Sequence, residues 1–222
     1  MVTTSPSNQP DAPVYQGQFG EFTITESDRQ EVKIYRGGMA IAALSFALGT
    51  MLLLWQGANE SILSGINVCY TLFCVGLGVS LLTIHIYLIP LHRLLQIFWL
   101  VGIVTSLVFA YASPQPFALY VYNNPLTLFG VGFLFAALTG IFFKEAFCFN
   151  RLETKILTPL VPMLLVGHLV NILPLEVERM VLGGWSALFL IFALRKLFQP
   201  IPDDIGDKSV FEHLKQGGKI TG

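Results

Sequence analysis

Two histidines lie within apolar stretches of this chain, where an imidazole could ligate a haem or a pigment. His85 is in the second apolar stretch and His168 is in the fifth. A haem bound by both would need them at similar depth on facing helices, but a rise of about 1.5 Å per residue separates them by about 10 Å. A bis-histidine haem is therefore not expected. Each histidine could still bind a pigment singly, although an interhelical hydrogen bond worth about 1 kcal/mol is the favoured interpretation.

Metal-binding and catalytic motifs are missing from the sequence. Cys69 and Cys74 are five residues apart on a predicted helix, so their side chains point about 140° away from each other. No HExxH, GxSxG or phosphate-binding glycine loop occurs. We therefore expect no metal site, no bound cofactor and no enzymatic activity.

Charged residues avoid the middle of the apolar stretches, which argues against a proton-coupled or ion-coupled transporter. The nearest cases lie at predicted helix ends and are Lys144, Glu145, Arg195 and Lys196. Long side chains at such positions extend toward the lipid headgroups. A structural role at the membrane surface is therefore favoured over a functional one.

A polar pathway through the bilayer is a further hypothesis. Pro159 and Pro162 fall near the start of the fifth apolar stretch, while Asn67 and Asn171 flank the second and the fifth. Together with His168 they could line a route for a solute, because discontinuous helices mark transporter sites. The prolines fall in the predicted first turns, however, where proline costs little, and this favours a structural role.

Small residues recur at every fourth position and predict close helix packing. They are Gly132, Ala136 and Gly140 in the fourth apolar stretch, and Gly76 and Ser80 in the second. Such lines let two helix backbones approach closely in lipid. Packing within the molecule is the favoured interpretation, and an interface with another membrane protein is the alternative.

Composition and hydropathy predict an all-α, polytopic membrane helix bundle. The 222 residues are 54% hydrophobic and 12% charged, with a mean hydropathy of +0.65, whereas soluble domains carry about 25% charged residues. A membrane helix needs about 20 apolar residues. Six stretches meet this need, at about 38–56, 66–89, 94–113, 126–143, 156–173 and 177–198. The uncharged aromatic segment 114–124 is predicted to lie on the membrane surface, with a re-entrant segment as the alternative.

The positive charges predict the orientation of the bundle. One side carries Arg29, Lys33, Arg36, Arg93, Lys144, Arg151, Lys155, Arg195, Lys196, Lys208, Lys215 and Lys219, and the other side carries Arg179. Because Lys and Arg accumulate in cytoplasmic loops, both chain ends are predicted to be cytoplasmic. The net charge of −1 leaves no basic surface for nucleic acid. The expected partners are the lipid bilayer and other membrane-complex subunits.

The chain is therefore predicted to have three regions. Residues 1–36 form a polar cytoplasmic amino tail with a disordered start and a short ordered segment, 37–199 form the six-span membrane domain, and 200–222 form a cytoplasmic carboxyl tail with a short amphipathic helix. Ser27 and Gln30 have capping-box spacing, which predicts where the first helix begins.

Two segments are candidates for docking a partner. The loop between the fourth and fifth stretches mixes charge with aromatic residues, and SVFEHLKQ in the carboxyl tail predicts a short amphipathic helix. The candidate docking residues are Lys144, Phe147, Phe149, Arg151, Phe211 and Leu214. The structural interpretation of the loop is an amphipathic connector at the headgroups.

Four segments resemble a family of small integral membrane proteins of cyanobacteria that is catalogued as a domain of unknown function. They are VYQGQFGEFTITESDR, SLLTIHIYLIPLHRLLQIFW, LTGIFFKEAFCFNRLETKILTPLVP and QPIPDDIGDKSVFEHL, so the resemblance extends from about Val14 to Leu214. It implies a photosynthetic host, and hence a thylakoid or plasma membrane. It implies no activity and no catalytic residue.

The main functional hypothesis is a non-enzymatic factor that assembles or scaffolds membrane complexes. It rests on the missing catalytic motifs, the small-residue lines and the two tails. The alternative is a channel or carrier for a small neutral solute, and pigment binding through one histidine comes after it.

Overall fold

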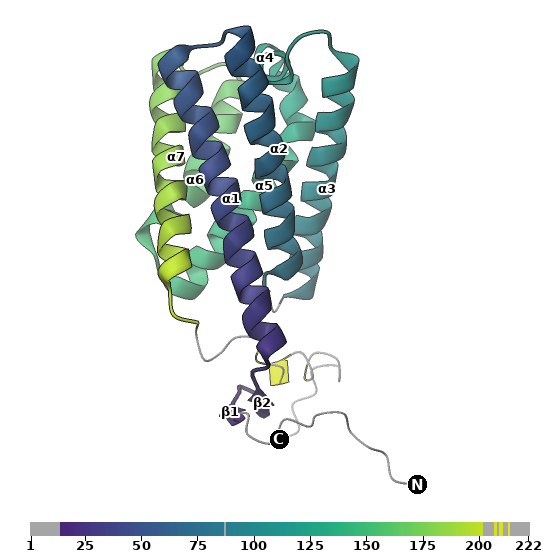
Figure 1. Cartoon of the computed structure of the whole chain (residues 1–222), viewed down its shortest axis with the longest axis vertical. Helices are drawn as coiled ribbons and strands as arrows, with labels where there is room; N and C mark the ends of the chain where they lie inside the picture. Colours follow the sequence, from purple (N-terminus) through teal and green to yellow (C-terminus); the bar gives the residue numbers. More distant parts are fainter. Residues whose placement is uncertain (1–13, 87, 202–206, 208, 211–212, 214–222) are drawn as a thin grey trace. The chain divides into compact units, whose positions relative to one another are not determined.

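A computed structural model of the chain describes residues 14–86, 88–201, 207, 209–210 and 213. The chain divides into two compact units, one of Met1–Lys33 with Pro200–Gly222 and the other of Ile34–Gln199. The larger unit is a bundle of long helices that run side by side (Figure 1). Its two ends are called here the terminal end, where the unit begins and finishes, and the opposite end.

The described part of the chain is almost entirely helical. Its helices are α1 (Glu26–Gln56), α2 (Glu60–Thr83), α3 (Ile89–Ala112), α4 (Phe117–Asn123), the 3-10 helix η1 (Pro125–Thr127), α5 (Leu128–Phe149), α6 (Leu152–Leu169) and α7 (Leu175–Phe198). Among the described residues, six segments are long and apolar enough to cross a membrane, namely α1, α2, α3, η1 with α5, α6 and α7. The predicted all-α membrane bundle is confirmed.

The start of α1 differs slightly from the prediction. The helix begins at Glu26, and Thr25 and Asp28 cap it. The Asp28 carboxylate accepts hydrogen bonds from the Thr25 N–H at 2.7 Å and from the Thr25 hydroxyl at 2.8 Å. Thr25 and Asp28 are three residues apart, as are Ser27 and Gln30, so the predicted spacing occurs two residues earlier.

Asparagine ends two of the membrane helices. Asn150 after α5 and Asn171 after α6 have φ values of 51° and 54°, in the left-handed region that asparagine tolerates. At the second turn the Asn171 N–H donates to the His168 carbonyl and the Ile172 N–H donates to the Gly167 carbonyl. These two bonds form a Schellman motif, so Asn171 has a local role in ending α6.

The positions of the two prolines in α6 correct one prediction. α6 begins at Leu152, because α5 continues to Phe149 and a short turn joins them. Pro159 and Pro162 therefore lie inside the helix and not in its first turn. A proline lacks the N–H that would bond the carbonyl four residues earlier, so the Lys155 and Thr158 carbonyls lose that donor.

The core of the bundle lies between α1, α2, α5 and α7 and is rich in aromatic rings. The rings of Phe46 and Trp185 are 4.4 Å apart, those of Phe135 and Trp185 are 5.4 Å apart, and those of Phe73 and Phe135 are 5.7 Å apart. Each such pair contributes about 0.5–1.5 kcal/mol beyond the area that it buries. These rings fill the space between the four helices.

α1 and α2 make the closest backbone approach that involves the predicted small residues. A Cβ added to Gly76 would lie 2.6 Å from the Gly38 carbonyl oxygen, so only glycine fits. Ser80, one turn further along α2, donates hydrogen bonds to the Tyr35 carbonyl at 3.1 Å and the Gly76 carbonyl at 2.9 Å. Gly76 and Ser80 thus lie at the contact between these two helices.

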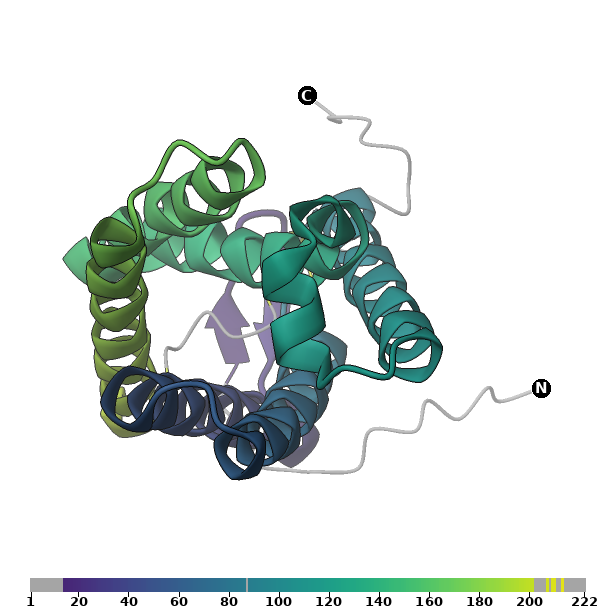
Figure 2. The ribbon, with the colours of Figure 1, turned by 90° about the horizontal axis from the view of Figure 1, so that it is seen from above.

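The aromatic segment 114–124 contains the short helix α4, where a surface loop was expected. α4 lies across the opposite end of the bundle (Figure 2). Phe117 at its start packs on Tyr70 of α2 with ring centroids 5.0 Å apart, and Tyr120 packs on Phe109 of α3 at 6.0 Å. These contacts hold α4 on the helices beneath it.

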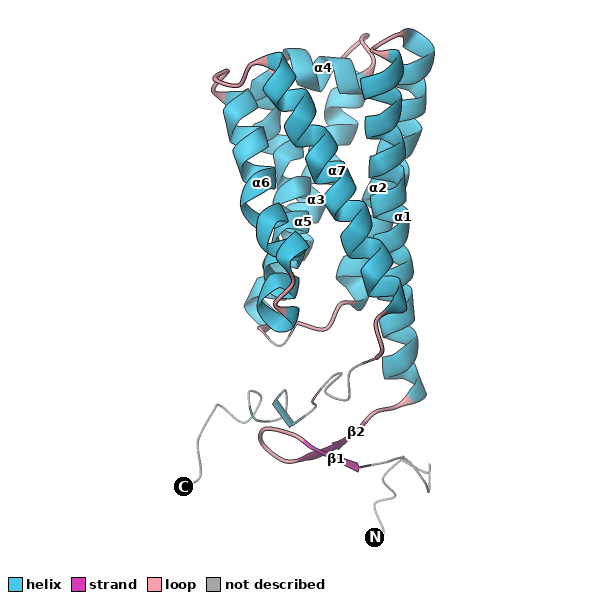
Figure 3. Ribbon diagram, turned by 90° about the vertical axis from the view of Figure 1, so that its left-hand side faces the viewer, coloured by secondary structure: helices cyan, strands magenta, loops and turns pink. Residues whose placement is uncertain are grey.

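The smaller unit brings the two tails of the chain together. The strands β1 (Val14–Gln16) and β2 (Glu21–Thr23) form an antiparallel hairpin (Figure 3). At its turn the Gln18 N–H donates to the Asp207 carboxylate at 2.9 Å and the Phe19 N–H donates to the Ser209 hydroxyl at 3.1 Å. The Phe19 ring also stacks on His213 at 4.0 Å.

The predicted amphipathic helix of the carboxyl tail is described in part. Ser209, Val210 and His213 are helical. Phe211 and Leu214, the two candidate docking residues of this segment, lie outside the described residues.

Candidate functional site

A buried ion pair lies near the terminal end of the bundle, where sequence reasoning predicted side chains extended toward the headgroups. Glu145 of α5 is 0% exposed and Lys196 of α7 is 4% exposed. Their side chains point inward and meet, so the prediction that they extend outward is wrong. The physical reason is pairing, since a charged group can stay buried when an opposite charge and hydrogen bonds compensate its lost hydration.

The Glu145 carboxylate has a donor for each oxygen. Its Oε2 accepts a 2.6 Å hydrogen bond from Lys196 Nζ. Its Oε1 accepts from the Tyr35 hydroxyl at 3.0 Å and from Lys144 Nζ at 3.2 Å. Lys196 Nζ also lies 3.9 Å from the centroid of the Phe149 ring, which is a cation–π contact. The cluster therefore joins α1, α5 and α7.

A second carboxylate extends the charged cluster to α6. Glu153 is 4% exposed and accepts a 3.0 Å bond from Arg195, while Arg151 lies 3.6 Å away. Arg151 also donates to the Gln199 side chain at 3.1 Å, and Arg36 of α1 donates to the Gln199 carbonyl. All four of these helices are thus tied at one end. Because its charges are paired with each other, the cluster is suited to holding the ends of these helices together.

The sequence carried a signal for the buried pair. Glu145 follows Leu138 and Ile141 at helical spacing, on the face that α5 buries in the core. Lys196 follows Phe189 and Phe192 in the same way on α7. Residues three or four apart lie on one face of a helix, so a charge in register with core positions points inward.

A second polar cluster lies at the opposite end of the bundle and contains His168. His168 Nδ1 is 2.7 Å from Glu178 Oε1 of α7, and Nε2 is 3.1 Å from the Tyr122 carbonyl oxygen of α4. The Tyr122 hydroxyl donates to Glu178 Oε2 at 3.2 Å. The favoured interpretation of His168 was an interhelical hydrogen bond, and the structure places it in two.

His85 lies outside the apolar helix to which it was assigned. α2 ends at Thr83, so His85 belongs to the connection that leads to α3. Ser80, in the last turn of α2, bonds α1 near the terminal end, whereas His168 contacts α4 at the opposite end. The two histidines are therefore not brought together. Among the described residues, no group of three or more His, Cys, Asp or Glu side chains could hold a metal ion.

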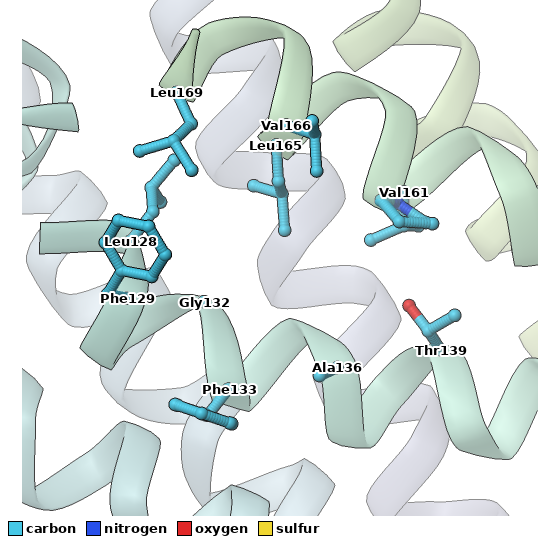
Figure 4. Close-up of a pocket in the computed structure, with 11 residues that line it drawn as sticks. Leu128, Phe129, Gly132, Phe133, Ala136, Thr139, Val161, Leu165, Val166 and Leu169 are labelled. Atoms are coloured by element: carbon cyan, nitrogen blue, oxygen red, sulfur yellow. The ribbon is translucent and has the colours of Figure 1, made fainter. Parts of the chain in front are cut away.

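The small-residue line of α5 lies in two different surroundings. Gly132 and Ala136 line a groove of about 320 Å³ between α5 and α6 (Figure 4). Gly140 instead faces the side chain of Leu95 on α3, which a Cβ would approach to 2.3 Å. Nothing closer than Leu128 of the same helix, at 3.8 Å, would meet a Cβ on Gly132. At Gly132, therefore, the line makes no close contact with another helix of the described part of the chain.

The groove is apolar and opens away from the core. Phe129 and Val166 on its walls are 67% and 53% exposed. Pro162, one of the prolines inside α6, also lines the groove, and Thr139 is its last lining residue along α5. Thr139 satisfies its own hydroxyl by donating to the Phe135 carbonyl at 2.8 Å.

The remaining candidate residues are spread over several elements. Asn67 is half-buried on α2, and its Oδ1 has no hydrogen-bond partner within the described part of the chain. Asn171 is exposed in the turn after α6, and Pro159 is exposed on α6. Only Pro162 of the proposed pathway residues lines the groove.

The candidate docking loop is largely part of α5 and of the charged cluster. Lys144, Phe149 and Arg151 make the contacts described above. Phe147 is 84% exposed and is the one described docking candidate of this loop that points freely outward.

Comparison with known proteins gives a family and nothing more specific. The sequence model of an uncharacterised integral membrane protein family, DUF2301, matches residues 79–213. No curated protein matches the chain, and no solved structure matches it. The matched segment runs from the end of α2 through α7 into the carboxyl tail. It includes the groove, the His168 cluster and all of the charged cluster except Tyr35 and Arg36 of α1. Because the match covers more than half of the 222 residues, the chain belongs to this family of integral membrane proteins of unknown function.

Proposed function

We propose that this protein is a non-enzymatic factor that assembles or scaffolds other membrane proteins, and that the groove between α5 and α6 receives a transmembrane helix of a partner. One observation carries the proposal. Gly132 and Ala136 are spaced for close helix contact, yet both line an open apolar groove, and a Cβ on Gly132 would meet no other described helix within 4 Å.

A helix suits this groove better than a lipid tail does. In hydrocarbon, two helices gain little from the hydrophobic effect, and their association depends on close packing of backbones at small residues. Gly132 and Ala136 are one turn apart and offer such an approach. An acyl chain is thin and flexible and needs no line of small residues on one helix.

The experiment places a photo-crosslinking phenylalanine analogue at Phe133, which lines the groove. Illumination in the native membrane, followed by mass spectrometry, should identify an apolar helix of another protein as the attached group. The same analogue at Leu107, which is 65% exposed on α3, is the matched control and should attach lipid. Attachment of lipid alone at Phe133 would overturn the proposal.

A filled groove should release the partner. Ala136→Leu places a larger side chain in the groove, and a mild-detergent pull-down should then lose the cross-linked protein. Ala187→Leu, at an exposed alanine of α7, is the control that should keep it. Equal recovery from both variants would contradict the assignment of the groove.

One observation favours the alternative, a channel or carrier for a small neutral solute. Pro159 and Pro162 interrupt the backbone bonding of α6 inside the helix, and Pro162 lines the groove. Freed carbonyls at membrane depth need protein or water to satisfy them. Proteoliposomes should then conduct a neutral solute at a rate that Pro162→Ala changes, and absence of flux for a panel of such solutes would remove this alternative.

The terminal end of the bundle is proposed to face the cytoplasm, in a plasma or thylakoid membrane of a photosynthetic host. The uneven distribution of Lys and Arg supports this orientation. Cys148, exposed at the end of α5, should resist a membrane-impermeant thiol reagent added to intact cells, whereas Asn123→Cys on α4 should react. The reverse labelling pattern would invert the topology.

A further inference from the structure

We propose that the cluster of His168, Glu178 and Tyr122 is a proton-dependent latch that holds α4 onto α6 and α7. The cluster joins three elements at the opposite end of the bundle. His168 comes from α6, Glu178 from the first turn of α7 and Tyr122 from the last turn of α4. This inference is independent of the α5–α6 groove.

Both nitrogens of the His168 ring face hydrogen-bond acceptors. Nδ1 lies 2.7 Å from Glu178 Oε1, and Nε2 lies 3.1 Å from the carbonyl oxygen of Tyr122. A backbone carbonyl can only accept, and so can an ionised carboxylate. A neutral imidazole has one N–H and can satisfy one of these partners. Both bonds form together when the ring carries two protons and the carboxylate is ionised.

The other groups around the ring favour this assignment. The Tyr122 hydroxyl already donates to Glu178 Oε2 at 3.2 Å, and the rings of Tyr122 and His168 are 4.8 Å apart. From α7, Arg179 and Glu176 pair with each other at 3.5 Å. The segment 125–143, which forms η1 and most of α5, contains no ionisable residue. The ionisable partners of His168 among the described residues are thus Glu178 and Tyr122.

Loss of one proton should loosen the last turn of α4. The carbonyls in the last turn of a helix have no donor from their own helix, and His168 supplies one to Tyr122. A deprotonated ring keeps either the bond to Glu178 or the bond to Tyr122. The side chain of His168 is 19% exposed, so protons from the aqueous phase at this end can reach it.

The latch responds to the range in which histidine changes its charge. Histidine is the side chain type that ordinarily changes its charge between about pH 5 and pH 8. At low pH both bonds form and α4 is fastened at its carboxyl end. At high pH the ring donates to only one of its two acceptors. α4 then relies on the bond from the Tyr122 hydroxyl to Glu178 and on the ring contacts of Phe117 and Tyr120 with α2 and α3.

The test measures hydrogen exchange of the α4 amides in nanodiscs, where both faces of the protein meet the buffer. Protection factors, which correct for the intrinsic pH dependence of exchange, are compared at about pH 5 and about pH 9. Loss of a charge-assisted hydrogen bond should lower the wild-type protection of Asn124, whose N–H bonds the Tyr120 carbonyl, by about tenfold or more. Equal protection of wild type at the two pH values would overturn the proposal.

Glu178→Gln separates a latch from a general effect of pH. The glutamine amide can donate to Nδ1 while its oxygen accepts from the Tyr122 hydroxyl, so a neutral ring can donate from Nε2 to the carbonyl. This variant should remain protected at both pH values. Loss of its protection at high pH, as in wild type, would also overturn the proposal.

Two further variants complete the design. His168→Leu removes both bonds and should show the low protection at every pH. His92→Gln is the matched control, because His92 of α3 contacts the Leu81 carbonyl in the last turn of α2, away from α4. The His92→Gln variant should retain the pH dependence of wild type. Loss of the pH dependence in this variant would assign the effect to His92 and overturn the proposal.

Discussion

Removal of Lys196 should destabilise the bundle strongly, because it leaves Glu145 as a buried carboxylate with fewer partners. Glu145 is 0% exposed, and Lys196 Nζ lies 2.6 Å from its Oε2. Breaking a buried ion pair by removing one partner costs about 3–5 kcal/mol. Lys144 remains 3.2 Å from the other oxygen, so we expect Lys196→Met to cost about 3 kcal/mol, at the lower end of that range.

The double variant Glu145→Gln/Lys196→Met distinguishes a lost pair from lost packing. Glutamine keeps an oxygen for the Tyr35 hydroxyl, which donates to Glu145 at 3.0 Å, and it carries no charge that needs Lys196. Replacing both members of a buried pair is often close to neutral. The double variant should therefore recover at least about 2 kcal/mol of the loss caused by Lys196→Met alone.

The assay is unfolding in mixed micelles by SDS titration, followed by circular dichroism, with the four proteins of a double-mutant cycle. Arg179→Met is the control, since the Arg179 and Glu176 side chains are 55% and 78% exposed and their pairing should contribute about 1 kcal/mol or less. The reasoning is refuted if Lys196→Met unfolds at the wild-type SDS concentration. It is also refuted if the double variant is as unstable as Lys196→Met.

Two further predictions concern backbone contact and the tails. Gly76→Ala should destabilise the protein by about 1–3 kcal/mol, since its Cβ would meet the Gly38 carbonyl at 2.6 Å, whereas Gly132→Ala in the groove should unfold like wild type in the same titration. For Asp207, burial raises the pKa of the carboxyl, but hydrogen bonds from Ser209 and Gln18 outweigh it and lower the pKa below the ordinary 3.8. The contribution of this carboxylate to stability is therefore present at neutral pH and is lost as the pH falls through the lowered pKa. Hydrogen-exchange protection of the Gln18 amide should accordingly fall in acid. Asp207→Asn should show the weaker protection already at neutral pH.

The architecture of the membrane part could be predicted from the sequence because the bilayer imposes it. Apolar stretches of helix length have one stable form in lipid, in which every backbone group is bonded within its own segment. The six spans therefore followed from hydropathy, while their ends shifted by several residues. The start of α6 moved from about 156 to Leu152, and this shift placed Pro159 inside the helix. A two-residue turn at Asn150 and Arg151 leaves little hydropathy signal, so the boundary was not visible.

The candidate sites were less accessible to sequence reasoning because they depend on contacts between distant residues. The hypothesis of side chains extended toward the headgroups treated Glu145 and Lys196 separately, although they are 51 positions apart and neutralise each other. His168 was recognised as a candidate, but its partners lie 10 and 46 positions away along the chain. The register of Glu145 with Leu138 was the local clue.

The amino-acid sequence by itself determined that this chain is an all-α membrane protein with six apolar helices, because composition and segment length decide which solvent a chain can fold in. The tertiary structure alone decided which faces of those helices meet. Gly76 meets α1, Gly140 meets α3, and Ala136 faces an open groove, although spacing marks all three in the same way. Spacing specifies a face of a helix, whereas the rotation of each helix against its neighbours depends on all of the packed side chains at once.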